Sequence, residues 1–222
     1  MDPEGLRNAE GRLWLNVASS RDVLPRFVNL DNSIYLRMLP LARFARPLLN
    51  ADHREWLDSY RDAAARTRLL RHDCREPLPL PDACADHVLC SHFLEHVHPV
   101  EARAILADLH RVLRPGGTAH LIVPDLGVLV DEYVKSRGEP EAADQLVRET
   151  FLSRESRGSL RFRLMEFLGG FGLNHRWMYD GASLRRRVEE TGFEVLEGND
   201  TPSSEYRRDD GISVHVVGRK RL

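Results

Sequence analysis

Hydrophobic and polar residues form two patterns along this chain. Short, mostly apolar runs such as "RLWLNV" at 12–17 and "ADHVLCSH" at 85–92 are typical of buried strands. Longer segments between them repeat apolar residues every three or four positions, which is typical of helices. We expect about seven strands, at 12–17, 26–31, 67–73, 85–92, 118–126, 193–198 and 211–220.

The helical pattern is clearest in "EARAILADLHRVL" at 101–113. One apolar stripe runs along it, formed by Ala102, Ile105, Leu106, Leu109 and Leu113. The following "RPGG" predicts the end of this helix, because Gly116 or Gly117 can adopt the left-handed conformation of a C-cap. Further helices are expected at 52–66 and, after the capping residue Asp180, at 181–192.

The order of these elements predicts an α/β fold. Strands that alternate with helices favour a Rossmann-like, mostly parallel sheet with helices on both faces, and the closing strand pair indicates that the last strand is antiparallel. We expect one domain over 1–222, with helical insertions at about 33–66 and, after the fifth strand, 127–173. Residues 18–25 are too few for a normal helical crossover, so any helix there must be vestigial.

Composition and charge exclude several classes of partner. The 32 basic and 34 acidic residues nearly cancel, which disfavours nucleic acid and anionic membranes as partners. No apolar stretch reaches the ~20 residues of a membrane-spanning helix. The three cysteines form no Cys-x-x-Cys pair, which disfavours a disulfide framework and structural zinc. Because the N-terminal residues show no signal-peptide pattern, we expect a cytoplasmic protein with reduced thiols.

In an open parallel sheet, ligands bind at the carboxyl ends of the strands. The stretches that surround these ends are "LNVASSRDVLPRFVNLDNS", "RHDCREPLPLPD", "CSHFLEHVHPVEA", "LHRVLRPGG", "LIVPDL" and "NHRWMYDGASL". Together and in this order, they resemble class I S-adenosylmethionine (SAM)-dependent methyltransferases. More narrowly, the chain is similar to a small bacterial branch whose members often lie among surface-polysaccharide genes. The resemblance implies SAM as the cofactor.

The resemblance also assigns parts of the cofactor to positions of this chain. Asp31 would accept hydrogen bonds from both ribose hydroxyls, because a carboxylate offers two acceptor oxygens. Asp73 and the backbone of Cys74 would hold the adenine edge, while Ser91 and His92 would border the sulfonium. The methionine part would lie against Asn16, Ala18, Ser19 and Ser20.

The turn after the first strand departs from the family. Members usually read Gly-Cys-Gly where this chain has Ala18, Ser19 and Ser20. Glycine suits these positions because it allows positive φ and close approach of the backbone to a ligand. A serine hydroxyl, in turn, can donate to the cofactor carboxylate. The departure leaves open a cofactor-free relative that acts as a binding or scaffold module.

The stretch "HFLEH" places His92, Glu95 and His96 at helical spacing. This is the pattern of inverted zinc peptidases, but it begins where a strand ends, which argues against that function. Some metal-dependent methyltransferases carry Glu-x-x-Glu-His here, and His92 in place of the first Glu would suit a softer ion than magnesium. The favoured alternative has no metal, with Glu95 and His96 orienting the loop and capping the next helix.

The stretch "NHRWMYD" offers His175 as a general base, since a histidine pKa near ~6.5 suits proton removal. His92 is the other candidate base. Trp177, Tyr179 and Asp125 are candidates for contacting substrate. The alternative for His175 and Trp177 is that they pack the helical insertion onto the sheet.

Arginines in the second insertion, Arg154, Arg157, Arg161 and Arg163, could form a lid that attracts an anionic substrate; a solvated helix face is the favoured alternative. The predicted function is methyl transfer from SAM to an oxygen or nitrogen atom of a small molecule or glycan intermediate. A SAM-binding enzyme that performs another reaction on the sulfonium, such as intramolecular displacement, remains an alternative. The sequence does not predict an oligomeric state.

Overall fold

The computed structural model describes residues 2–153, 174–198, 200–207 and 209–222. Its centre is a seven-stranded sheet in the order β3-β2-β1-β4-β5-β7-β6. Neighbouring strands are parallel except that β7 runs antiparallel to β5 and β6. The predicted α/β fold class is therefore confirmed. The strands are β1 (Trp14–Val17), β2 (Val28–Asp31), β3 (Arg68–Arg71), β4 (Ala85–Ser91), β5 (Leu113–Pro124), β6 (Phe193–Leu196) and β7 (Ser213–Lys220).

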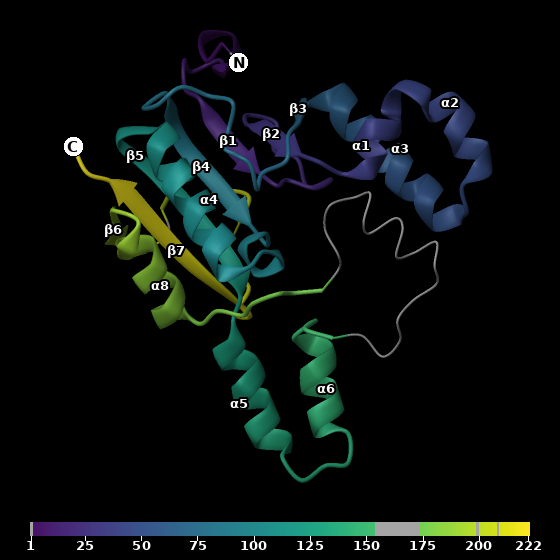
Figure 1. The fold of residues 1–222 in the computed structure, drawn as a ribbon, viewed down its shortest axis with the longest axis vertical. Helices are drawn as coiled ribbons and strands as arrows, with labels where there is room; N and C mark the ends of the chain where they lie inside the picture. The colour runs from purple at the N-terminus through teal and green to yellow at the C-terminus, as the bar shows by residue number, and fades with distance from the viewer. Residues whose placement is uncertain (1, 154–173, 199, 208) are drawn as a thin grey trace.

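Helices lie against the sheet and beyond two of its edges (Figure 1). The α-helices are α1 (Ile34–Met38), α2 (Ala42–Ala45), α3 (Ala51–Arg66), α4 (Pro99–Val112), α5 (Leu126–Ser136), α6 (Ala142–Glu149) and α8 (Gly181–Glu190). Short 3₁₀ helices are η1 (Glu4–Leu6), η2 (Leu39–Leu41), η3 (Arg46–Leu48) and η4 (Leu94–His96). Both insertions are thus helical where they are described: α1 to α3 lie beyond β3, and α5 and α6 extend from the carboxyl end of β5 (Figure 1). Among the described residues, no helix combines the length and the hydrophobicity of a membrane span.

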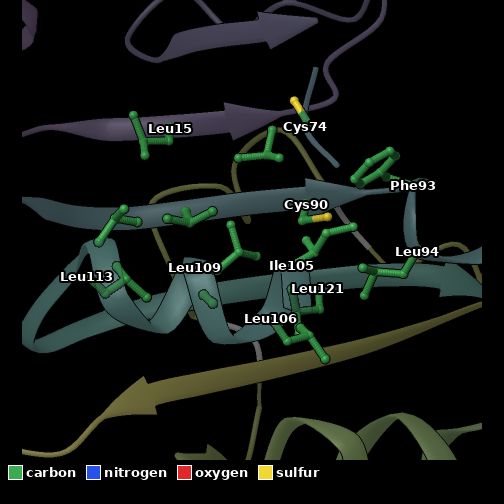
Figure 2. Close-up of a cluster of buried hydrophobic side chains, with 14 of the residues drawn as sticks. Leu15, Cys74, Cys90, Phe93, Leu94, Ile105, Leu106, Leu109, Leu113 and Leu121 are labelled. Carbon is green, nitrogen blue, oxygen red and sulfur yellow. The ribbon is translucent and has the colours of Figure 1, made fainter. Parts of the chain in front are cut away.

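One face of the sheet packs against α4 and forms the larger core. Figure 2 shows Ile105 and Leu109 of α4 pointing toward Leu15, Cys90 and Leu121 of the central strands. The alternation of these strands is the expected one, because successive side chains point to opposite faces. All three cysteines are free and buried, as expected.

The opposite face packs against irregular segments. Trp14, Leu89 and Ile122 point to this face, where Leu24 and Phe27 from the link between β1 and β2 cover them. Tyr206, from the segment before β7, packs on the same cluster. The link itself contains no helix, as its length predicted.

The predicted end of the α4 helix is wrong in its details. Leu113 is extended and already belongs to β5, so the "RPGG" stretch lies inside a strand and does not form a C-cap. Gly116 does adopt a left-handed φ of 77°. It lies in the stretch of β5 between Leu113 and Thr118, where the register with β4 shifts. The glycine therefore allows an irregularity within the strand and does not end the helix.

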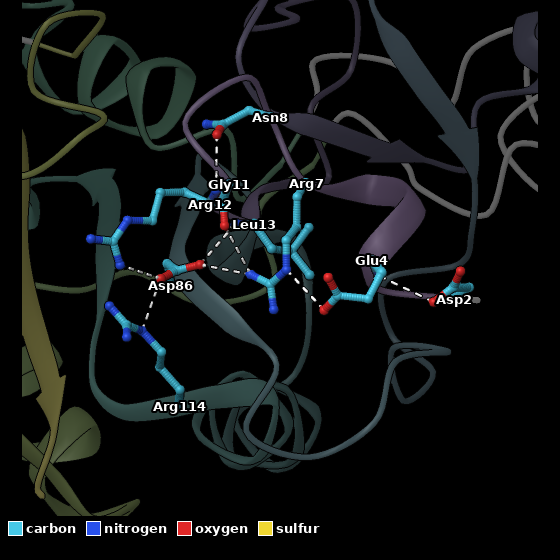
Figure 3. Close-up of polar contacts among 9 residues, drawn as sticks. All are labelled: Asp2, Glu4, Arg7, Asn8, Gly11, Arg12, Leu13, Asp86 and Arg114. Atoms are coloured by element: carbon cyan, nitrogen blue, oxygen red, sulfur yellow. Dashed lines mark hydrogen bonds and ion pairs between the residues drawn. The ribbon is translucent and has the colours of Figure 1, made fainter.

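A network of charges fixes the amino ends of β1 and β4, at the edge of the sheet away from the expected ligand site. The buried carboxylate of Asp86 accepts from the backbone N–H of Leu13 at 2.8 Å. It also pairs with Arg7, Arg12 and Arg114 at 3.4, 3.0 and 2.9 Å (Figure 3). The N-terminal segment is thereby tied to the start of β4.

Candidate active site

The order of the strands reverses between β1 and β4, and this position is the switch point of the sheet. From β1 the chain proceeds outward through β2 and β3, whereas from β4 it proceeds toward β5 on the other side. The loops that leave β1 and β4 therefore diverge, and ligands of open α/β sheets bind in the crevice between such loops. The residues to examine first are those that follow Val17 and Ser91, the last residues of these strands.

The turn after β1 keeps a glycine-like backbone although it contains no glycine. Ala18 and Ser20 have φ angles of 55° and 51°, in the left-handed region that L-residues rarely adopt. Ser19, between them, donates its backbone N–H to Leu30 of β2 at 2.9 Å. Left-handed residues with side chains persist only where the surrounding structure holds them, and they concentrate at functional sites. The turn thus has a backbone conformation that glycine would adopt without strain.

The carboxylate of Asp31 closes β2 directly beside this turn. Its Oδ2 accepts from the backbone N–H of Ser20 at 3.0 Å, and its Oδ1 accepts from the backbone N–H of Ser33 at 2.7 Å. The hydroxyl of Tyr60, on α3, donates to Oδ1 at 2.9 Å. Burial raises the pKa of Asp31 above its ordinary value, although these hydrogen bonds act in the opposite direction.

Tyr60 is a site residue that the sequence did not reveal. Its side chain is only 1% exposed, and its hydroxyl also lies 3.4 Å from the Ser20 Oγ. Burial raises the pKa of Tyr60, so the hydroxyl stays protonated and remains a donor at neutral pH. A tyrosine within an amphipathic helix gives no sign of its long-range partner, because that contact depends on how the first insertion folds back.

These residues match the chemistry of a ribose. A carboxylate has about four acceptor positions, and the chain itself occupies three of them on Asp31. The remaining position is on Oδ2, so a second ribose hydroxyl would have to take the place of the Tyr60 hydroxyl. Asp31 thus keeps one acceptor position for a ribose hydroxyl, and Tyr60 competes for a second. Contact of Asp31 and of the turn with SAM stays a prediction.

The residues assigned to adenine lie just beyond β3. The predicted third strand ends two residues too late, because β3 stops at Arg71. The Asp73 carboxylate pairs with the Arg75 guanidinium at 2.6 and 3.0 Å, which lowers the pKa of Asp73. Burial raises the pKa of the Cys74 thiol to about 12. A cavity of about 50 Å³ adjoins Cys74, well below the volume of typical ligand pockets. Contact with adenine stays a prediction.

Asn16 points into the sheet. Its amide donates to the Asn29 Oδ1 at 2.9 Å and to the Asp22 carbonyl at 3.0 Å, and the side chain is buried. These bonds hold the link between β1 and β2. The structure therefore gives Asn16 a structural task, and its contact with the methionine part of SAM stays a prediction.

His92 follows Ser91 at the end of β4 and faces solvent. It has a left-handed φ of 51°, and its backbone N–H donates to Ile122 of β5 at 2.9 Å. The imidazole is 49% exposed, and its Nδ1 lies 3.4 Å from the Glu95 Oε1. The Glu95 carboxylate itself is buried. This pair places a histidine with an adjoining carboxylate at the switch point of the sheet.

The two histidine-rich stretches of the sequence meet at Glu95. The backbone carbonyl of Glu95 accepts from the N–H groups of Arg176 and Trp177 at 2.7 and 3.2 Å. The rings of His96 and His175 lie 4.9 Å apart, edge to face. Burial lowers the pKa of His175, partly offset by the charge of Glu95, so the imidazole is neutral near pH 7. The sequence named these residues but could not show that they converge.

The expectation that Glu95 and His96 cap the following helix is wrong. The N-cap of α4 is His98, and its backbone N–H donates to the Glu101 carboxylate at 2.8 Å. Since Glu101 already serves the helix end, the Glu95 and His96 side chains are left for other tasks.

The three predicted substrate residues differ in their exposure and in their contacts. Trp177 is 43% exposed, whereas Tyr179 is buried and its hydroxyl approaches the Leu94 carbonyl at 3.5 Å. Asp125 caps α5 by accepting from the Gly127 N–H at 2.7 Å. Contact of these residues with substrate stays a prediction. Arg154, Arg157, Arg161 and Arg163 lie outside the described residues.

Comparison with known proteins agrees with this geometry. Residues 38–121 match the family model described as a methyltransferase domain. This match supports the predicted class of enzyme, a SAM-dependent methyltransferase. No curated protein matches the sequence.

Two solved structures show that the fold is shared. A SAM-dependent methyltransferase from Methanosarcina mazei has a TM-score of 0.51 and 14% identity, covering 94% of this chain and 92% of its own. The PH0226 protein from Pyrococcus horikoshii has a TM-score of 0.50 and 14% identity, covering 99% of this chain and 87% of its own. At this identity the likeness concerns the fold alone.

Proposed function

We propose that this methyltransferase domain transfers a methyl group from SAM to an oxygen or nitrogen atom of a small molecule or glycan intermediate. The observation that carries the proposal is the left-handed turn at Ala18 and Ser20, held against the Asp31 carboxylate at the switch point. A glycan acceptor rests on the resemblance to the branch found among surface-polysaccharide genes, and not on the fold.

In this proposal, Asp31 holds the ribose and the turn after β1 lies against the methionine part. SAM, when bound, supplies a methyl group on a positively charged sulfur. The chain has to bring the acceptor into line with that methyl group, exclude water and remove the proton of the acceptor. Ser91 and His92, at the carboxyl end of β4, would border the sulfonium and its methyl group.

His92 is the better placed of the two candidate bases. Its imidazole is half exposed, whereas the Nδ1 of His175 is buried. With Glu95 beside Nδ1, the ring would be held with its proton on that atom, which leaves the Nε2 lone pair free. His92 Nε2 would take the acceptor proton as the acceptor oxygen or nitrogen attacks the methyl carbon.

A cofactor-free binding module remains the second candidate, and one contact favours it. The Tyr60 hydroxyl already occupies an acceptor position on Asp31 that a ribose would need. In a protein that had lost its cofactor, this contact would be permanent. The two candidates make opposite predictions about ligand binding.

Isothermal titration calorimetry with SAM and S-adenosylhomocysteine tests the proposal. We expect saturable binding that Asp31→Ala abolishes, because the ribose loses its acceptor. Tyr60→Phe removes the competing donor and keeps the ring, so it should bind SAM as well as or more tightly than the unmodified chain. Absence of binding at millimolar ligand, or unchanged binding in Asp31→Ala, would contradict the proposal. Asp73→Asn serves as a second probe, for the predicted adenine contact.

A further inference from the structure

Three buried polar atoms near the end of β4 have no hydrogen-bond partner among the described residues. They are both carboxylate oxygens of Glu95 and the Nδ1 of His175. Glu95 is only 1% exposed. A buried carboxylate without donors is costly, and native proteins pair such groups or use them as metal ligands. Within the described part of the chain, the nearest basic group to this carboxylate is the His92 Nδ1, 3.4 Å from the Glu95 Oε1, which makes no hydrogen bond to it.

The geometry of the cluster fits a metal ion. One ligand atom from each of Glu95, His96 and His175 lies within 4.8 Å of the other two. A metal ion ~2.1 Å from each ligand requires ligand atoms ~3–4 Å apart, which small side-chain rotations would achieve. The atoms come from two segments that backbone hydrogen bonds already join, because the Glu95 carbonyl accepts from Arg176 and Trp177.

The histidines are also oriented as metal ligands usually are. The Nδ1 of His96 lies 3.4 Å from the Asn174 carbonyl. Donation to that carbonyl leaves the Nε2 lone pair available, and a second hydrogen bond of this type commonly fixes the ring of a metal ligand. The Nδ1 of His175 is buried and has no hydrogen-bond partner among the described residues, and the ring also has a hydrogen bond with the Thr150 backbone.

We propose that Glu95, His96 and His175 form a binding site for one divalent transition-metal ion, such as Zn²⁺. Two imidazole nitrogens and one carboxylate oxygen suit zinc, which binds such sets with a fourth position open. Magnesium and calcium prefer oxygen ligands and larger numbers of them. His92, beside Glu95, is the nearest residue that could approach the open position.

The site is separate from the proposed SAM contacts. Its ligands come from η4 and from the segment before α8, whereas the SAM proposal rests on the turn after β1 and on Asp31. Metal binding can therefore be measured without SAM, and its failure would not test SAM binding at Asp31. The two proposals share Glu95, which also lies beside the proposed base His92. A bound ion would also join "HFLEH" to "NHRWMYD", two stretches that are far apart in the sequence.

The test uses the full chain, stripped with a chelator and then titrated with Zn²⁺ and separately with Co²⁺. We expect one ion per chain, a rise in melting temperature, and visible ligand-field bands with Co²⁺. Glu95→Gln keeps the shape and removes the charged ligand, and His175→Ala removes an imidazole. Loss of outer-shell partners alone weakens metal sites by ~10–100-fold, so each variant should bind at least ~100-fold more weakly.

Two control variants separate this site from other histidines and acids. His98→Asn removes an exposed imidazole two residues from His96 and leaves a favoured N-cap residue. Asp209→Asn changes the other group of acids and histidine, Asp209, Asp210 and His215. Both controls should bind as the unmodified chain does. The proposal is overturned if the chain binds no ion, if Glu95→Gln and His175→Ala bind undiminished, or if the controls lose binding equally. Circular dichroism confirms that each variant is folded.

Discussion

Three residues with left-handed backbones stand at the switch point of the sheet. Ala18 and Ser20 follow β1, and His92 follows β4. A left-handed conformation costs an L-residue roughly 1 kcal/mol or more, so hydrogen bonds such as Ser20 N–H to Asp31 must hold it. The sequence predicted two of these positions because glycine is usual there in the family. It gave no such sign for His92, where the conformation follows from the tertiary structure.

Replacing Ser20 by glycine tests this cost directly. Ser20→Gly removes the penalty and, among the described contacts, loses the 3.4 Å contact with the Tyr60 hydroxyl. We expect the free energy of unfolding to stay the same or to rise by up to ~1 kcal/mol, with SAM binding equal or tighter. Urea denaturation and calorimetry measure the two effects.

Ser19→Gly is the matched control, because Ser19 lies in the same turn and is not left-handed. There glycine adds freedom to the unfolded chain and removes the 3.3 Å hydrogen bond from the Ser19 hydroxyl to the Ser20 carbonyl, so we expect a loss of ~1 kcal/mol. Equal losses in both variants would mean that the left-handed backbone at Ser20 carries no cost.

At the scale of elements, the link between β1 and β2 contains no helix, and a buried side-chain amide holds it in place. The side chain of Asn29, on β2, accepts from the Asn16 amide and from the Leu24 N–H at 2.9 and 2.8 Å. It donates to the Leu24 and Phe27 carbonyls, each at 3.1 Å. The sequence showed that the link is too short for a helix. It did not show what holds the link, since an asparagine inside a strand resembles any polar position.

Asn29→Ala should therefore destabilise the fold strongly. It removes the acceptor of the buried Leu24 N–H and of the Asn16 amide, and the donor to the Phe27 carbonyl, while the Leu24 carbonyl still accepts from the Phe27 N–H. Each buried group that loses its partner costs ~1–3 kcal/mol. We expect the free energy of unfolding to fall by ~3 kcal/mol or more, measured by urea denaturation.

Asn32→Ala is a suitable comparison, because Asn32 is also buried but its side chain accepts only from Arg37 among the described bonds. We expect a loss of ~1 kcal/mol there. Similar losses for the two variants would show that Asn29 does not hold the link.

At the scale of the whole molecule, the two faces of the sheet differ in polarity. The face covered by α4 is apolar, while the other contains a chain of polar contacts under Thr201 and Ser203. The Ser203 Oγ lies 2.9 Å from His87 and 2.8 Å from His120. The sequence predicted the strands that carry these histidines, and the strict alternation of the sheet turns them inward. Ser203, which contacts both histidines, lies in an irregular segment. No pattern in the sequence predicted that this segment would lie against the sheet.

These histidines predict that the fold is sensitive to mild acid. Burial lowers the pKa of His87 to about 3 and that of His120 to about 4, with His215 and Arg207 also disfavouring the charged form of His120. In the unfolded chain both would titrate near ~6.5. Below that pH the unfolded state binds protons that the folded state does not, so stability is full above ~6.5 and is lost as the pH falls toward the folded values.

The size of the loss follows from the pH interval. At pH 5 each histidine is ~1.5 units below its unfolded pKa, which corresponds to ~2 kcal/mol each and ~4 kcal/mol for the pair. Urea denaturation at pH 7 and pH 5 measures it. His120→Gln keeps a polar group near Ser203 but cannot titrate, so the difference between the two pH values should shrink by ~2 kcal/mol. His98→Asn, which changes an exposed histidine, should leave it unchanged. If His120→Gln and the unmodified chain lose the same stability, then protonation of His120 is not what destabilises the fold in acid.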